Sequence, residues 1–187
     1  MIKNIGTIKI ETDRLILRKF ELRDAKDMFH NWANDDDVTK YMTWTSHQDI
    51  NATKYVLSLW VDQYSDDNYY RWCIESKETG QVIGGIDVVQ IIEDLDCCEI
   101  GYCLSKKYWN KGIMTEALIA VENFLFDKVN FRRIQACHDT KTPASGKVMI
   151  KGGMQCEGIR RQAGKNNTGE FCDLATYAIL RSDWQKD

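Results

Sequence analysis

Proline is almost absent from this chain of 187 residues, since only one occurs, at position 143. Long apolar runs are absent as well, and none approaches the roughly 20 residues of a transmembrane helix. The first residues, 1–6, lack the continuous apolar stretch of a secretory signal. From these absences we expect a protein that neither spans a membrane nor is exported, and that is cytoplasmic.

Basic charge and metal-ligating residues are also scarce. The net charge of −3 lacks the basic excess that a nucleic-acid phosphate backbone requires, so we expect neither nucleic acid nor membrane as partner. Three scattered histidines and seven cysteines without a C-x-x-C pair show no zinc spacing. The odd cysteine count favours free thiols in a reducing compartment. Because no zinc spacing occurs, we also expect no metal cofactor.

The length and composition fit one domain that spans residues 1–187, with 43% hydrophobic and 28% charged residues. Periodicity predicts strands at residues 15–20, 70–74, 82–89, 98–104, 131–138, 154–161 and 171–180, and helices around residues 25–32, 52–60, 114–125 and 143–151. Ser46 and Thr142 are the expected N-caps of the second and fourth helices. The order β-α-α-β-β-β-α-β-α-β-β predicts an α/β fold, with a central mixed sheet flanked by helices.

The most informative segment joins the strand at residues 98–104 to the helix that follows. At such a junction the first backbone N–H groups of the helix and the positive end of its dipole point into the loop. That arrangement binds phosphate. Gly112 allows close approach of the backbone, and Asn110 tolerates left-handed conformations. Positive charge is added by Lys106, Lys107 and Lys111.

Two common phosphate-binding motifs, G-x-x-x-x-G-K-[ST] and G-x-G-x-x-G, do not occur in the chain. The segment 109–114 instead resembles the acyl-CoA pyrophosphate loop of the GNAT acetyltransferase superfamily, whose pattern is Q/R-x-x-G-x-G/A. The run Tyr-Trp-x-Lys-Gly-x-x-Thr-Glu-Ala-Leu is similar to the branch that acetylates ribosomal-protein N-termini (RimJ/RimL-type). The chain departs from that branch at Asn110, where glycine is favoured, and at Met114, where a small residue is usual.

The resemblance extends over about residues 11–184 and implies the GNAT fold, with acetyl-CoA as cosubstrate and a primary amine as acceptor. The residues that it implies for cofactor binding lie in the loop, at the helix start and on the preceding strand: Tyr102, Cys103, Leu104, Trp109, Asn110, Lys111, Gly112, Ile113, Met114 and Thr115. It also implies a cofactor contact at Thr142, which stands where the family usually has asparagine.

Acetyl transfer to an amine needs a base for the amine and a donor for the leaving thiolate. Glu99, three residues ahead of Tyr102 on the strand before the loop, is the candidate catalytic base. Ser145, in the first turn of the helix that Pro143 begins, is the candidate catalytic donor near the sulfur. Tyr102 and Tyr108 are alternative acids.

Aromatic residues are frequent in the N-terminal half, and two interpretations are open: with the acidic run at 35–37 they line an aromatic, acidic acceptor pocket suited to a cation, or several of them belong to the core. These aromatic residues are Trp32, Tyr41, Trp44, Trp60 and Trp72. The branch resemblance favours a protein N-terminal amine as acceptor, and a polyamine or an aminoglycoside remains an alternative. A catalytically silent acyl-CoA-binding regulator and a ligand-free interaction module also stay open, as do monomer and homodimer.

Overall fold

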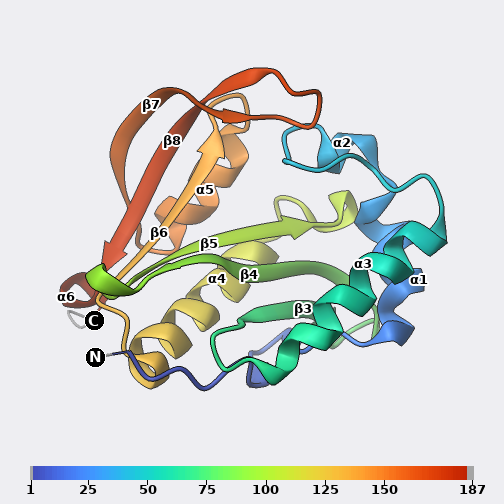
Figure 1. The fold of residues 1–187 in the computed structure, drawn as a ribbon, viewed down its shortest axis with the longest axis horizontal. Helices are drawn as coiled ribbons and strands as arrows, with labels where there is room; N and C mark the ends of the chain where they lie inside the picture. The colour runs from blue at the N-terminus through green and yellow to red at the C-terminus, as the bar shows by residue number, and fades with distance from the viewer. Residues whose placement is uncertain (1, 185–187) are drawn as a thin grey trace.

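The computed structural model describes residues 2–184, whose centre is a mixed sheet of eight strands (Figure 1). The strands are β1 (Ile10–Glu11), β2 (Leu15–Arg18), β3 (Arg71–Ser76), β4 (Val82–Ile92), β5 (Cys97–Leu104), β6 (Arg133–Asp139), β7 (Gln155–Lys165) and β8 (Phe171–Leu180). Their order in the sheet is β1-β2-β3-β4-β5-β6-β8-β7. Every neighbouring pair is antiparallel except β5 and β6, which are parallel. The predicted α/β fold with a mixed sheet is confirmed.

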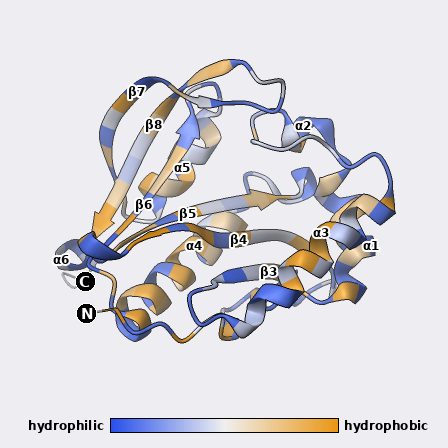
Figure 2. Cartoon of the chain, viewed as in Figure 1, coloured by the Kyte–Doolittle hydropathy of each residue, from blue (hydrophilic) through white to orange (hydrophobic). Residues whose placement is uncertain are grey.

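Helices cover both faces of this sheet. They are α1 (Ala25–Met28), α2 (Asp36–Thr39), α3 (Ile50–Asp62), α4 (Ile113–Phe124), α5 (Pro143–Lys151) and α6 (Arg181–Trp184). One buried cluster joins α4 and α5 to the sheet, and a second joins α1, α2 and α3 to its opposite face. In Figure 2 hydrophobic and hydrophilic residues alternate along α4, which fits the predicted helix with one buried side.

Several boundaries differ from the sequence-based expectation. Strand β7 continues to Lys165, into the predicted loop, and α3 begins after Asp49 rather than after Ser46. The Asp49 carboxylate accepts hydrogen bonds from the first backbone N–H groups of α3, while the Ser46 hydroxyl bonds to Asp36. The predicted domain of residues 1–187 includes Met1 and residues 185–187, which lie outside the described part of the chain.

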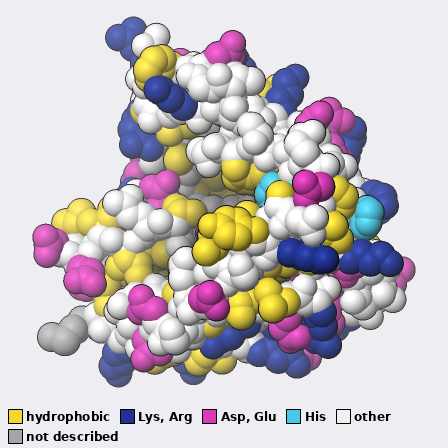
Figure 3. All heavy atoms as spheres, turned by 45° about the vertical axis from the view of Figure 1, so that its right-hand side comes forward, with side chains coloured by type: hydrophobic (Ala, Val, Ile, Leu, Met, Phe, Trp, Pro, Cys, Tyr) yellow, Lys and Arg dark blue, Asp and Glu magenta, His cyan; other side chains and the backbone are white. Residues whose placement is uncertain are grey.

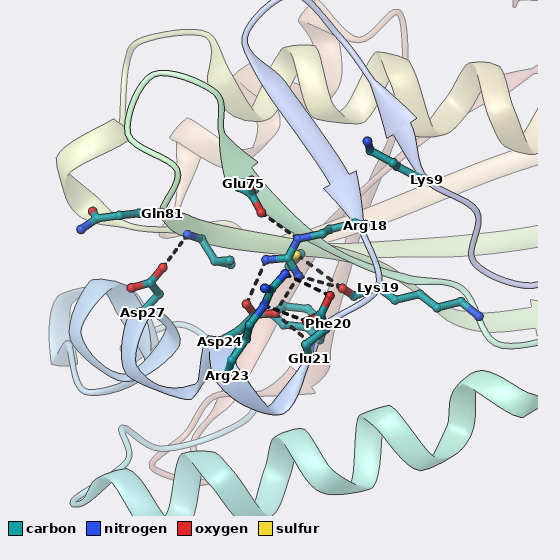
Figure 4. A network of polar contacts seen from close by, with 12 residues as sticks. Lys9, Arg18, Lys19, Phe20, Glu21, Arg23, Asp24, Asp27, Glu75 and Gln81 are labelled. Atoms are coloured by element: carbon teal, nitrogen blue, oxygen red, sulfur yellow. Dashed lines mark hydrogen bonds and ion pairs between the residues drawn. The ribbon is translucent and has the colours of Figure 1, made fainter.

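A buried ionic network attaches the start of α1 to the sheet (Figure 4). The Arg18 guanidinium donates two hydrogen bonds of 2.9 Å to the Asp24 carboxylate and one of 2.7 Å to Glu75. One turn further on, the Asp27 carboxylate accepts from the backbone N–H of Val82 at 2.9 Å. Because bidentate arginine–carboxylate pairs are directional, this network sets where α1 lies against β2, β3 and β4.

Candidate active site

The parallel pair at the centre of the sheet opens after three residues. Strands β5 and β6 are paired at Cys97–Arg133, Cys98–Ile134 and Glu99–Gln135, yet β5 continues to Leu104 and β6 to Asp139. Beyond Glu99 the two strands diverge, as Figure 1 shows. The peptide groups of β5 that face β6 therefore have no strand partner over this stretch, which leaves them available to a ligand.

Glu99 lies at the point where the strands part. Its half-buried carboxylate accepts a hydrogen bond of 2.9 Å from the Gln135 amide and one of 3.4 Å from the Cys137 thiol. Both donors come from β6, so the carboxylate is held beside the opening. Burial, with Glu99 as the next cause, raises the pKa of Cys137 to about 11, and the thiol keeps its proton near pH 7.

Tyr102 spans the opening from β5 to α5. Its hydroxyl lies 3.0 Å from the Ser145 carbonyl oxygen and 3.0 Å from the Ser145 hydroxyl oxygen. Burial raises the pKa of Tyr102, so its hydroxyl remains a hydrogen-bond donor at neutral pH. The structure therefore brings two of the predicted site residues, Ser145 and Tyr102, into direct contact.

The loop between β5 and α4 has the backbone geometry that its sequence predicts. Asn110 and Gly112 both have left-handed conformations, with φ of 59° and 73°. The first helical hydrogen bond of α4 runs from the Glu116 N–H to the Gly112 carbonyl oxygen. Within residues 2–184, no group accepts a hydrogen bond from the backbone N–H groups of residues 110–115. These donors lie at the start of α4, where the sequence predicts an anion site.

The loop is held by residues that the sequence analysis missed. The Glu116 carboxylate, in the first turn of α4, accepts hydrogen bonds from the Thr12 hydroxyl at 2.6 Å and from the Arg14 side chain at 2.6 Å. Arg14 also donates to the Lys111 carbonyl oxygen at 3.0 Å. Glu116 belongs to the recognised Thr-Glu-Ala-Leu run, but Thr12 and Arg14 lie about a hundred positions away and carry no local signal.

Two other predicted cofactor residues are engaged within the protein. The Trp109 indole donates to the Leu104 carbonyl oxygen at 2.8 Å. Thr142 occupies the predicted N-cap position of α5, but its hydroxyl donates to the Asp139 carbonyl oxygen at 2.7 Å and makes no capping bond. The expected capping role of the Thr142 hydroxyl is therefore wrong, because the N–H of Ser145 in the first turn donates to the Thr142 carbonyl oxygen instead. Pro143 follows as the first helical residue, as predicted.

A pocket of about 430 Å³ lies on the face of the sheet that carries α1 and α3. Its walls include residues of β4 and β5, among them Gly101, Tyr102 and Cys103, so it adjoins the opened strand. Figure 3 shows the molecule hollowed on this side, with hydrophobic side chains around the hollow. The aromatic side chains of the wall are Phe20, Trp32, Trp44, Trp60 and Tyr102, together with the imidazole of His47.

The charge inside this pocket is balanced. Arg71 and Asp87 form an ion pair on its wall, and the Arg71 guanidinium carbon lies 4.1 Å from the centre of the Trp60 ring. Burial raises the pKa of Asp87, and the neighbouring Arg71 opposes that rise. Burial lowers the pKa of His47, so its ring is neutral at pH 7.

The predicted pocket is therefore aromatic but not acidic. Trp32, Trp44 and Trp60 line it, whereas Trp72 is fully buried against the α4 side of the sheet. Tyr41 is not part of the wall. The carboxylates of residues 35–37 have other partners. Asp35 accepts from a backbone N–H at the start of α2, and Asp36 accepts from the Ser46 hydroxyl. Asp37 forms an ion pair with Lys106. The prediction of an acidic lining was wrong because these short-range partners engage all three groups.

None of the helices within residues 2–184 combines the length and the apolarity that crossing a bilayer requires. Over the same stretch, no three histidine, cysteine, aspartate or glutamate side chains converge in a way that would hold a metal ion.

Proteins similar to this chain include N-acetyltransferases. The profile of the acetyltransferase (GNAT) domain matches residues 14–155. The uncharacterized N-acetyltransferase p20 of Bacillus licheniformis is 31% identical, with 92% of this chain and 96% of that protein covered. The ribosomal protein uS5-alanine N-acetyltransferase of Escherichia coli (strain K12) is 22% identical, with 97% and 95% covered.

The fold is also that of a solved acetyltransferase. The crystal structure of the microcin C7 self-immunity acetyltransferase MccE, in complex with acetyl-CoA and AMP, superposes with a TM-score of 0.81 at 19% identity, over 90% of this chain and 93% of that one. The mixed sheet of this chain, opened at its parallel pair, is thus the fold of an acetyltransferase. The chain belongs to the acetyltransferase (GNAT) family and is an N-acetyltransferase, with relatives in the RimJ/RimL-type branch.

Proposed function

We propose that this protein transfers an acetyl group from acetyl-CoA to a primary amine by direct attack. The observation that carries the proposal is the row of backbone N–H groups at residues 110–115 that have no partner within residues 2–184 and lie in the connection from the opened strand to α4. These groups would bind the pyrophosphate, and the free edge of β5 at Tyr102, Cys103 and Leu104 would bind the pantetheine arm and the acetyl oxygen. The acetyl-CoA complex of MccE supports this cosubstrate.

Glu99 is the proposed base. It accepts, directly or through water, the proton that the acceptor amine loses as its nitrogen bonds to the acetyl carbon. The carbon–sulfur bond then breaks, and Ser145 donates a hydrogen bond or a proton to the leaving sulfur. Tyr102, in contact with Ser145, positions that hydroxyl and is the alternative acid. The β5 backbone N–H groups stabilise the charge that develops on the acetyl oxygen.

The acceptor would occupy the aromatic pocket beside β5, on the face opposite to α4 and α5. Within the proposal this acceptor is a protein N-terminal amine, which the name of the Escherichia coli relative supports. A small-molecule amine such as a polyamine or an aminoglycoside is the second candidate. A cytoplasmic location and a monomeric or dimeric state complete the proposal.

Two measurements test it. The first is the midpoint of thermal unfolding with and without CoA, because a ligand of the folded state stabilises by mass action. The second is thiol release from acetyl-CoA in the presence of a panel of peptides, polyamines and aminoglycosides. A CoA-dependent shift with thiol release is expected. No shift at millimolar CoA contradicts the proposed site, and a shift without release from any amine identifies a silent acyl-CoA-binding regulator.

A further inference from the structure

The aromatic pocket already contains a cation of its own. The Arg71 guanidinium stacks on the Trp60 ring at 4.1 Å and pairs with Asp87, the acidic side chain of the pocket wall. Aromatic rings and a carboxylate are the groups that hold a ligand ammonium. In this pocket the Arg71 side chain already occupies both an aromatic ring, Trp60, and a carboxylate, Asp87.

The rest of the wall is apolar. Around the ion pair lie aromatic and aliphatic side chains from three separate segments: Phe20, Met28, Trp32, Met42, Trp44 and Val56. His47 is uncharged at pH 7, because burial lowers its pKa, and its Nδ1 lies 2.7 Å from the Thr53 hydroxyl. A ligand group inside this pocket therefore meets flat apolar surfaces and an ion pair whose two charges already face each other, with the Arg71 Nε as the one buried atom of the pair that lacks a hydrogen-bond partner among residues 2–184.

We infer that the acceptor of this enzyme is a primary amine attached to one bulky apolar group, aromatic or large aliphatic, and that this group fills the pocket lined by Trp32, Trp44 and Trp60. The inference rests on the proposed acetyl transfer and names its substrate class. A volume of about 430 Å³ accommodates such a group. Because Gly101, Tyr102 and Cys103 form part of the wall, a group in the pocket leaves its amine next to β5.

The same surroundings exclude polycationic acceptors. A polyamine or an aminoglycoside would bring further ammonium groups into the pocket, where the Asp87 carboxylate is taken by Arg71. An ammonium that loses water without gaining a carboxylate is strongly disfavoured. A small N-terminal residue such as alanine would enter but leave most of the apolar wall uncovered.

The experiment compares kcat/KM for peptides that differ only in the first residue, phenylalanine, leucine or alanine, with phenylalanine amide and spermidine as further acceptors. The phenylalanine and leucine peptides should exceed the alanine peptide by about 100-fold, since single methylenes in apolar pockets change this ratio by roughly 10- to 200-fold. Spermidine should show no turnover. Phenylalanine amide as good as the peptide indicates a small-molecule source, and a much poorer amide indicates a polypeptide N-terminus.

A pair of variants on α3 locates the effect. Val56→Phe adds volume to the pocket wall and should lower the preference for phenylalanine over alanine at least tenfold, while CoA still raises the thermal midpoint. Tyr55→Ala removes the neighbouring side chain, which is 66% exposed and outside the pocket, and should leave the preference unchanged. If both variants change it equally, the pocket does not select the acceptor.

Failure of the inference and failure of the proposed function give different results. Alanine-initiated peptides or spermidine that react as well as phenylalanine peptides overturn the inference and leave acetyl transfer standing. If no amine releases thiol, the proposed function fails, and tryptophan fluorescence then decides on the pocket, because three tryptophans line it. A saturable change with phenylalanine amide but not with spermidine supports the apolar site, and no change overturns it.

Discussion

The candidate active site has two sides, the loop at residues 110–115 and the aromatic pocket, and they differ in the chemical groups that form them. The loop side uses backbone N–H groups from one continuous stretch, residues 110–115, at the start of α4 and separated by five residues from the end of β5. The pocket side uses side chains that the fold collects from α1, α3, β3, β4, β5 and the segment around residues 42–47. A backbone site depends on chain conformation, whereas a side-chain pocket depends on packing. The two sides should therefore respond to different kinds of mutation.

The largest effect is expected where the backbone conformation itself is the binding element. Gly112 has φ +73°, which a β-branched residue adopts only with strain. Gly112→Val should abolish the CoA-dependent rise in the thermal midpoint. Gly169→Val is the matched control, because Gly169 has φ +82° in the turn between β7 and β8, beyond β6 in the sheet order, and its strain should leave the CoA response intact. An undiminished response in Gly112→Val would contradict the loop assignment.

Glu99→Gln separates chemistry from cosubstrate binding. The variant should lose about 10²- to 10⁴-fold in kcat, the usual contribution of a positioned base, because an amide cannot take the amine proton. CoA should bind almost normally, since the carboxylate bonds to β6 rather than to the loop. Steady-state kinetics and the CoA thermal shift measure the two quantities. Full activity in Glu99→Gln would assign the proton to another group or to water.

Ser145→Ala and Tyr102→Phe test the two hydroxyl groups that meet between β5 and α5. Each should lower kcat by about 10- to 100-fold, the range of one hydrogen bond to a developing charge. Because the two hydroxyls lie 3.0 Å apart, the double variant should lose less than the product of the single losses. The α5 helix should persist in Ser145→Ala, since Pro143 still begins it. Circular dichroism checks the fold, and strictly multiplicative losses would show independent roles.

The smallest change in activity is expected at Glu122, a buried carboxyl on α4 whose pKa burial raises to about 8. In the unfolded chain this carboxyl loses its proton near pH 4.5, whereas in the folded protein it keeps the proton up to about pH 8. The free energy of unfolding therefore falls as the pH rises from about 4.5 to 8, by up to about 1.4 kcal/mol per pH unit. Glu122→Gln lacks this loss and should gain stability relative to wild type across that window.

Urea unfolding at pH 5, 6.5 and 8 measures the difference. The exposed Glu78→Gln is the control and should show no such trend. A difference between Glu122→Gln and wild type that stays constant with pH would show that the Glu122 carboxyl is ionised in the folded protein.

Local sequence signals were reliable where a single segment contains all the interacting groups. Pro143 begins α5, Asn110 and Gly112 adopt left-handed conformations, and α4 has its predicted apolar face. The N-cap of α3 was placed at Ser46 although Asp49 does the capping. Both residue types cap helices well, and only the path of the preceding chain decides between them.

Local sequence signals did not predict which charged residues line the pocket. The acidic run at 35–37 was expected in it, but short-range partners hold those carboxylates outside. The sequence does not predict the ion pair between Arg71 and Asp87 or its contact with the Trp60 ring. These residues lie on different elements, and no short sequence pattern indicates that they meet.

By itself the sequence determined the order of the main elements, the left-handed backbone at Asn110 and Gly112 and the family resemblance, because hydrophobic periodicity and glycine conformations are properties of neighbouring residues. Tertiary structure alone decided how β5 and β6 part after Glu99, how Tyr102 meets Ser145 and how Thr12 and Arg14 hold the loop. It also decided the balanced charge of the pocket. These features depend on contacts between segments far apart in the chain, whose geometry is set by packing rather than by local preference.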